Sequence, residues 1–167
     1  MSVAQVAHPS VPGTPAAQTA FVPKETTIVV QLQETVSSYD ASAGQALRLI
    51  VINDVVSNGL LIAKAGDDVE GKVVGAVRGK PDFGARGGDL KFQITTVHNY
   101  CGDPIAVHFT RSEYRNPNAS AFLSKLDVTV DKGQRYGVRV AYPQKVCGTP
   151  TQEVTPAPPS GVIFSNE

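Results

Sequence analysis

Residues 45–77 constrain the fold of this chain more than any other stretch. They read QALRLIVINDVVSNGLLIAKAGDDVEGKVVGAV, in which short β-branched runs are separated by two turn signals, Asn58-Gly59 and Ala65-Gly66. An Asn-Gly pair between apolar runs is the strongest local signal for an antiparallel hairpin. The stretch therefore predicts consecutive antiparallel strands, and we expect the rest of the chain to add strands beside them.

Composition narrows the fold class. The 167 residues suit one domain with its own hydrophobic core. Fifteen glycines and 12 prolines, with one methionine and no tryptophan, are typical of a chain with many turns and short strands. We therefore predict an all-β fold, a small antiparallel barrel or tight β-sandwich of about 7–9 short strands with extended Pro-rich tails.

Charge and hydropathy exclude several classes of partner. Lys plus Arg and Asp plus Glu both number 15, and this zero formal charge argues against nucleic acid and anionic membranes as partners. Residues 1–20 show no basic segment followed by an apolar run, so no signal peptide is visible. No run of about 18 apolar residues could span a bilayer. We expect either a cytoplasmic protein or the mature form of an exported one.

Period-two alternation of apolar residues locates the strands. In the 69–77 strand, Gly71 and Gly75 alternate with three valines, so we expect both glycines on a core-facing row where the sheet coils tightly. The Gly102-Asp103-Pro104 turn predicts a second hairpin, and Asp131-Lys132-Gly133 predicts a third. The expected strands are 26–32, 47–52, 60–62, 69–77, 89–97, 105–109, 126–130 and 136–140.

Both ends of the chain have the composition of extended tails. Residues 1–20 show no apolar periodicity, and residues 149–167 are rich in proline, so we assign the domain to 21–148. The second tail ends in the apolar triplet Val162-Ile163-Phe164. An exposed apolar end promotes association, so we predict that this triplet contacts a partner by adding to an open sheet edge.

The two cysteines, Cys101 and Cys147, allow three interpretations: a disulfide, a metal pair or two free thiols. Each is placed at the end of an expected strand, and a turn-rich chain of exported type favours the disulfide. A zinc site would need His98 and His108 as further ligands, yet their spacing matches no standard zinc pattern and surface imidazoles are the simpler interpretation. We predict the bridge, with no metal and no cofactor.

Two loops are candidate contact regions. Residues 78–88, RGKPDFGARGG, combine glycines with basic residues, but they lack the Gly-Lys-Ser/Thr of a phosphate loop and precede a strand rather than a helix. Residues 110–124 break the alternation, as an ordered excursion or a helical turn at 119–124. The residues that we expect to make loop contacts are Arg78, Lys80, Phe83, Arg86, Tyr114 and Arg115.

A run of turns and strands in the first two thirds of the chain resembles a known type of domain. Over roughly 21–109 the order is similar to a small β-domain of exported bacterial proteins of unassigned function, and more distantly to the β-barrel domain of conjugative and type IV secretion channel proteins. Ala63 stands where that barrel family has proline. The resemblance implies an exported, non-enzymatic β-domain and carries over no functional residue. Its matching elements are Ser37-Ser38, Gly44, Asn53-Asp54-Val55-Val56, Asn58-Gly59, Leu61 to Gly66 and Gly71-Lys72-Val73.

Two function classes follow from these features. The first is a non-enzymatic structural or assembly subunit of the bacterial cell surface or envelope, whose tails contact other copies or another envelope protein. The second is a periplasmic or secreted module that binds carbohydrate or peptide through the two loops. We assign no catalytic residue, because no nucleophile, base and orienting group can be placed together from the sequence. Both classes place the protein outside the cytoplasm.

Overall fold

The structure, a computed structural model, describes residues 16–81, 86–109, 113–115 and 126–151, and for 113–115 it describes the backbone only. This part of the chain contains strands and turns and no helix. The predicted all-β class is confirmed. In chain order, the strands are β1 (Gln18–Val22), β2 (Thr27–Leu32), β3 (Val36–Ser37), β4 (Ala46–Val51), β5 (Val55–Ser57), β6 (Leu60–Ala63), β7 (Asp68–Val77), β8 (Asp89–His98), β9 (Pro104–His108), β10 (Glu113–Arg115), β11 (Thr129–Val130), β12 (Arg135–Val140) and β13 (Gln144–Pro150).

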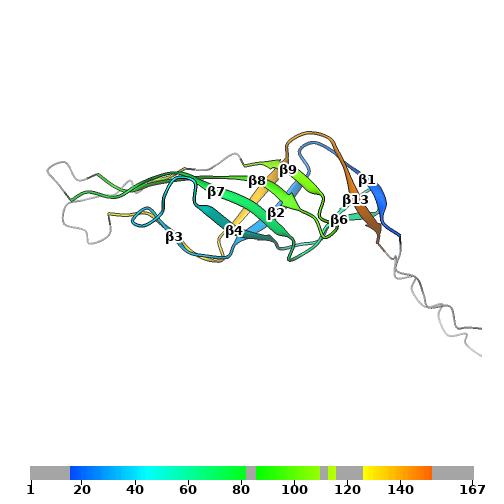
Figure 1. Cartoon of the computed structure of the whole chain (residues 1–167), viewed down its shortest axis with the longest axis horizontal. Helices are drawn as coiled ribbons and strands as arrows, with labels where there is room; N and C mark the ends of the chain where they lie inside the picture. The colour runs from blue at the N-terminus through cyan, green and yellow to red at the C-terminus, as the bar shows by residue number, and fades with distance from the viewer. Residues whose placement is uncertain (1–15, 82–85, 110–112, 116–125, 152–167) are drawn as a thin grey trace, which may run out of the picture.

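Six of these strands form a closed antiparallel barrel (Figure 1). The order around the barrel is β8, β7, β4, β2, β12 and β9, and β9 then pairs with β8 to close the ring. In the closing pairs, Val97 lies opposite Ile105 and Val140 lies opposite Val107. The structure thus contains the barrel that was one of the two predicted architectures. Closure leaves these six strands with few open edges.

Alternating side chains fill the barrel. Strands β2, β4 and β12 bury every second residue, as the period-two pattern predicts. On β8, the predicted inward residues Leu90, Phe92 and Ile94 are all buried. The ring of Phe92 lies 6.1 Å from that of Phe109 and 5.4 Å from that of Tyr136, measured between centroids, so aromatic packing joins β8, β9 and β12.

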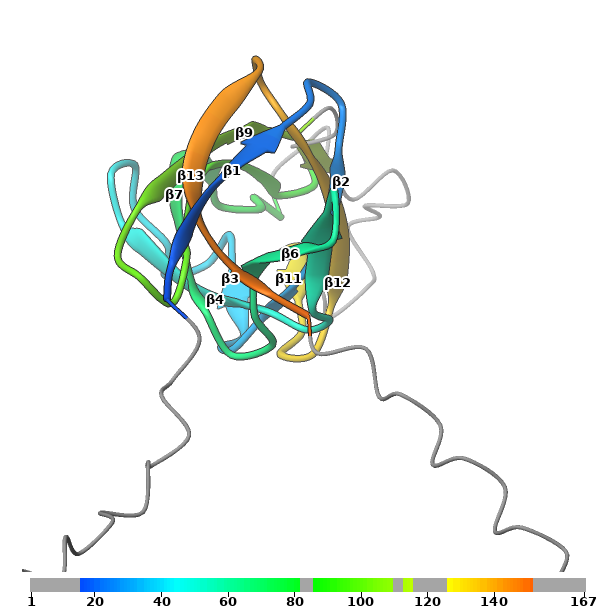
Figure 2. The ribbon, with the colours of Figure 1, turned by 90° about the vertical axis from the view of Figure 1, so that its right-hand side faces the viewer.

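A second sheet, which we call the end sheet, packs at one end of the barrel and consists of β1, β13, β6 and β5 in that order (Figure 2). Its inner residues Val22, Ile62 and Val146 belong to the same hydrophobic core as the barrel residues. Its outer strands approach each other, because the Ser57 hydroxyl on β5 donates a hydrogen bond of 2.8 Å to the carbonyl oxygen of Phe21 on β1. The end sheet is therefore curled and shares one core with the barrel.

The folded domain extends beyond both predicted boundaries. Strand β1 starts at Gln18, which lies opposite Gly148 in β13, and β13 continues to Pro150. Sequence reasoning assigned 18–20 and 149–150 to the tails because residues 1–20 show no apolar periodicity and the segment after Cys147 is rich in proline. Gly148 is a packing position, since a Cβ there would lie 2.9 Å from Ala20 Cβ and 3.0 Å from Leu60 Cβ.

The third predicted hairpin is wrong. Strand β11 pairs with β3, with Val130 opposite Val36, whereas β12 pairs with β2 and β9. The predicted turn does form, with Gly133 at φ 94°, but it directs the chain from one sheet into another. Strand alternation reports which face is buried and carries no information about the partner strand, so both strands fitted a hairpin equally well.

Strand β7 contains two register shifts that change the predicted role of its glycines. Between Val73 and Gly75 the strand advances two residues while β8 advances one, so Val74 is an inserted bulge residue. The bulge reverses the alternation, and Val77 is consequently exposed. Gly71 faces the interior as predicted, since a Cβ there would lie 2.8 Å from Leu49 Cδ1. The inward placement of Gly75 is wrong, because a Cβ there would meet nothing within 4 Å.

This difference between the two glycines predicts unequal effects of the same substitution. Gly71→Val overpacks the interior against Leu49 and lowers the free energy of unfolding by about 1 to 3 kcal/mol. Gly75→Val adds a side chain in open space and leaves it nearly unchanged. Urea denaturation of both variants measures the difference. Equal losses at the two positions would contradict the register that the structure gives to β7.

Candidate functional site

The structure brings the described parts of the two predicted contact loops, 78–81, 86–88 and 113–115, to the same end of the molecule. There β7, β8 and β10 form an extension, the arm, that reaches away from the barrel at the end opposite the end sheet (Figure 1). In the arm, Asp89 of β8 lies opposite both Val77 of β7 and Arg115 of β10. Segments 78–88 and 113–115 are therefore neighbours, which the sequence did not predict.

Three of the predicted contact residues are exposed on the arm: Arg78, Lys80 and Arg86. Arg78 lies over the exposed ring of Tyr39, with 3.4 Å between the guanidinium carbon and the ring centroid, a cation–π contact. Lys80 and Arg86 form a hydrogen-bonded backbone pair, with N···O distances of 2.9 and 3.1 Å in the two directions. Of the remaining predicted contact residues, Phe83 and the side chains of Tyr114 and Arg115 lie outside the described part of the structure.

A polar cluster fixes the base of the arm. The Ser38 hydroxyl donates to Asp127 Oδ1 over 3.0 Å and accepts a hydrogen bond from the Val128 backbone N–H. The backbone N–H of Gly79 donates to the same carboxylate oxygen over 2.8 Å. Because Ser38 is 3% exposed, these bonds are shielded from water and hold three distant segments together.

Two glycines allow this close approach. A Cβ at Gly79 would lie 2.5 Å from Leu126 Cβ, and a Cβ at Gly88 would collide with Ser38 Oγ. The glycine-rich loop thus serves packing at the base of the arm, rather than the phosphate binding that was considered for it. Sequence reasoning missed Ser38 and Asp127, because 89 residues separate them and neither belongs to a recognisable motif.

The cluster at the arm base predicts a local loss of order on mutation. Asp127→Ala removes the acceptor of both Ser38 Oγ and the Gly79 N–H, so we expect a loss of about 1 to 3 kcal/mol in unfolding free energy. Hydrogen exchange of the Gly79 amide should accelerate before that of the barrel strands. Asp131→Ala, at an exposed position, is the matched control. An unchanged exchange rate at Gly79 would show that Asp127 does not hold the arm.

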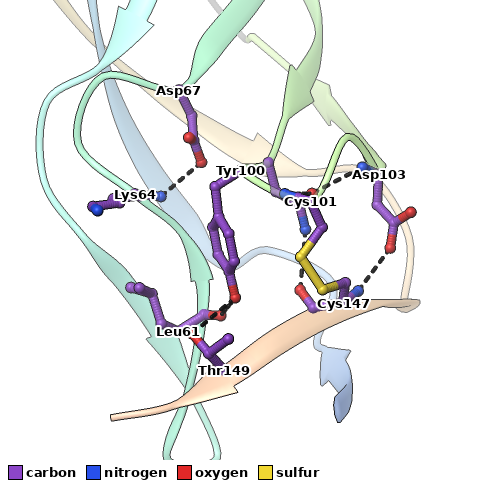
Figure 3. The surroundings of a disulfide bond; sticks show 9 residues. Leu61, Lys64, Asp67, Tyr100, Cys101, Asp103, Cys147 and Thr149 are labelled. Carbon is purple, nitrogen blue, oxygen red and sulfur yellow. Dashed lines mark hydrogen bonds between the residues drawn. A yellow bond between two sulfur atoms is a disulfide. The ribbon is translucent and has the colours of Figure 1, made fainter. Parts of the chain in front are cut away.

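The predicted disulfide is present at the opposite end. Cys101, in the turn between β8 and β9, is bonded to Cys147 on β13, with 6.3 Å between the Cα atoms (Figure 3). The bond therefore joins the barrel to the end sheet. Asp103 reinforces this connection, because its carboxylate accepts a hydrogen bond of 2.7 Å from the backbone N–H of Cys147.

The Asn99 side chain forms hydrogen bonds with backbone groups on both sides of the disulfide. The side chain is 3% exposed, and Oδ1 accepts hydrogen bonds from the backbone N–H groups of Cys101 and Asp103 over 3.1 and 2.8 Å. Its Nδ2 donates to the carbonyl oxygen of Cys147 over 3.0 Å. A buried amide that bonds both partners of a disulfide positions the two segments independently of the sulfur atoms. The sequence offered no signal for this role.

The zinc alternative for the cysteines is wrong, because both sulfur atoms are used in the disulfide. The two histidines instead face carboxylates: His98 Nε2 lies 2.7 Å from Glu70 Oε1, and His108 Nε2 lies 3.8 Å from Glu25 Oε1. A hydrogen bond from Arg139 holds the pKa of the Glu25 carboxyl below its usual value, with His108 adding a smaller effect in the same direction. These are exposed pairs on the barrel surface.

A groove of about 460 Å³ lies on the barrel wall and is lined by residues of β4, β7 and β8. Its charged side chains are those of Glu70 and Lys72, both exposed, and Glu70 already contacts His98. Ligand pockets of this size normally aim several polar groups at one point. The groove lacks such convergence among its lining residues, so the arm and the end sheet are the stronger candidates for contact surfaces.

The disulfide has a measurable contribution to stability. The bond closes a loop with a sequence separation of 46 residues, for which chain entropy gives about 4 kcal/mol. The double variant C101A/C147A should therefore melt at a lower temperature, while Asn99 and Asp103 keep the barrel and end sheet in contact. Thiol titration of the denatured, unreduced wild-type protein should find no free thiol. Two free thiols per chain would contradict the bond.

In the part of the chain that the structure describes, no helix has the length and hydropathy needed to cross a membrane.

A search of known protein families finds no match to this chain, and a search of curated proteins finds no related sequence.

Proposed function

We propose that this protein is a non-enzymatic structural or assembly subunit of the bacterial cell surface or envelope. The observation that carries the proposal is the two-ended layout of the domain. The described parts of the predicted contact loops, 78–81, 86–88 and 113–115, lie in the arm, whereas β1 begins and β13 ends in the end sheet, at the other end of the barrel (Figures 1 and 2). A subunit with a contact surface at each end can join neighbours on both sides.

The disulfide supports an extracytoplasmic location. Bonds between cysteines persist in the periplasm, at cell surfaces and in secreted proteins, and they are rare in the cytosol. The Cys101–Cys147 bond joins two parts of the fold and its turn is further fixed by Asn99, which is the arrangement of a structural bond rather than a catalytic one. The resemblance of residues 21–109 to exported bacterial β-domains agrees with this location.

The proposed role of the tail starts from its attachment point. The backbone N–H and the hydroxyl of Thr151 both bond to the carbonyl oxygen of Gly59, each over 3.1 Å, so the described chain ends beside the β5–β6 turn. The Val162-Ile163-Phe164 triplet lies beyond, outside the described residues. We propose that this triplet adds to a sheet edge of a neighbouring subunit or envelope protein, where ladder hydrogen bonds and alternate side chains supply affinity.

A second candidate function is a binding module for carbohydrate or peptide. The observation that favours it is the convergence of segments 78–88 and 113–115 in the arm, with Arg78 stacked on Tyr39. A small ligand bound there would leave the protein monomeric. Oligomeric state therefore separates the two candidates.

Light scattering of the full chain at micromolar concentration tests the proposal, alongside a chain truncated after Thr151. We expect the full chain to form large species and the truncated chain to stay small. Equal melting temperatures of the two proteins would show that truncation leaves the domain folded. A full chain that remains monomeric at every concentration would contradict the assembly role, and assembly that survives truncation would show that the tail is a passive linker.

A further inference from the structure

The zero net charge of the chain conceals an uneven distribution. Residues 78–91 include four basic and two acidic side chains, and residues 110–125 include three basic and one acidic. On the described part of the arm, Lys80 and Arg86 are exposed and lie directly opposite each other. Like charges in opposite positions destabilise an antiparallel pair. Neither residue belongs to the ion pairs found among the described residues, so none of these pairs offsets this cost.

The end sheet presents a different surface. Two large apolar side chains are exposed on the sheet, Phe21 of β1 at 46% and Val56 of β5 at 49%, and Tyr100 of the adjoining β8–β9 turn is 36% exposed. The Tyr100 hydroxyl donates to Leu61 O (Figure 3), Leu61 lies opposite Val56, and the hydroxyl of the residue after Val56 donates to Phe21 O, so the three lie on neighbouring segments. Exposed apolar side chains grouped on one surface are typical of a contact surface.

Carboxylates border this apolar surface. Asp54 accepts a hydrogen bond from the Ala65 backbone N–H over 2.9 Å, and Asp67 accepts one from the Lys64 N–H over 2.7 Å, so the two acidic residues lie on adjoining turns. Asp68 follows directly and is exposed. Three carboxylates outnumber the two ammonium groups nearby, Lys64 on the same turn and Lys145 opposite Phe21, so this border carries a net negative charge. We call the three apolar and three acidic residues the end face.

We propose that the basic arm of one copy docks on the end face of a second copy. The charges of the two surfaces are opposite, which steers encounter and fixes orientation, and burial of the apolar side chains supplies affinity. Because the arm and the end face occupy opposite ends of one domain, the contact is head to tail and leaves a free surface at each end of any pair. Such a contact extends into a linear assembly. This inference rests on the assembly function proposed above and names its partner surfaces.

Charge reversal in the full-length protein tests the proposal. The arm variant K80E/R86E should weaken self-association by about tenfold or more at low salt, and D68K on the end face should weaken it in the same direction. The barrel-wall double variant K132E/R135E reverses as many charges at exposed positions and should associate as the wild type does. Sedimentation velocity at low and high salt measures the self-association of all three variants. Thermal melts confirm that each variant is folded.

Mixing the two reversed variants gives the decisive result. The acidic arm of K80E/R86E meets the basic substitution of D68K, so the mixture should associate more strongly than either variant alone. If both variants associate as strongly as the wild type does, the arm does not dock on the end face. The assembly function would then still stand, with the tail as the remaining contact. A wild-type chain that stays monomeric throughout would overturn both proposals.

Discussion

Strand β9 makes the barrel possible because it pairs along both of its edges. Ile105 lies opposite Val97 of β8, and Val107 lies opposite Val140 of β12, so one five-residue strand joins the two ends of the sheet formed by the other five barrel strands. Without that double pairing, β8 and β12 would each present an open edge. The Phe109 ring packs against the rings of both Phe92 and Tyr136, which also contact each other, and this packing stabilises the same junction from inside. The remaining parts of the molecule are attached to this ring.

Buried polar groups reinforce each attachment, in addition to the hydrophobic core that the barrel shares with the end sheet. At one end, Asn99 and the Cys101–Cys147 bond connect the β8–β9 turn to the end sheet. At the other end, Ser38 and Asp127 hold the base of the arm. Such bonds are strong in a shielded environment and costly to break, so both ends stay fixed in relation to the barrel. This rigidity suits the proposed assembly role, because the angle between the two contact surfaces of a subunit sets the direction in which a linear assembly grows.

Sequence patterns predicted the features that depend on neighbours in the chain. Alternation located β2, β4 and β8 to within a residue, and the Asn58-Gly59 turn has the positive φ angles of 51° and 75° that its sequence requires. The disulfide was also predicted, although Cys147 lies within β13 rather than at a strand end. Features set by distant segments were missed. The bulge at Val74 reversed one strand face, and Ser38 gained its role from a residue far along the chain. The convergence of the two loops likewise depends on which strands pair, information that alternation does not contain.

In the proposed assembly, two surfaces at opposite ends of one domain meet between copies. Hydrogen exchange of the full chain, followed as protein concentration rises, tests this contact most directly. We expect protection to increase together at the Lys80–Arg86 hairpin and at strand β5 of the end sheet, while β2 and β12 in the barrel wall remain unchanged. Protection that rises at only one of the two ends, or mainly along the barrel wall, would contradict it.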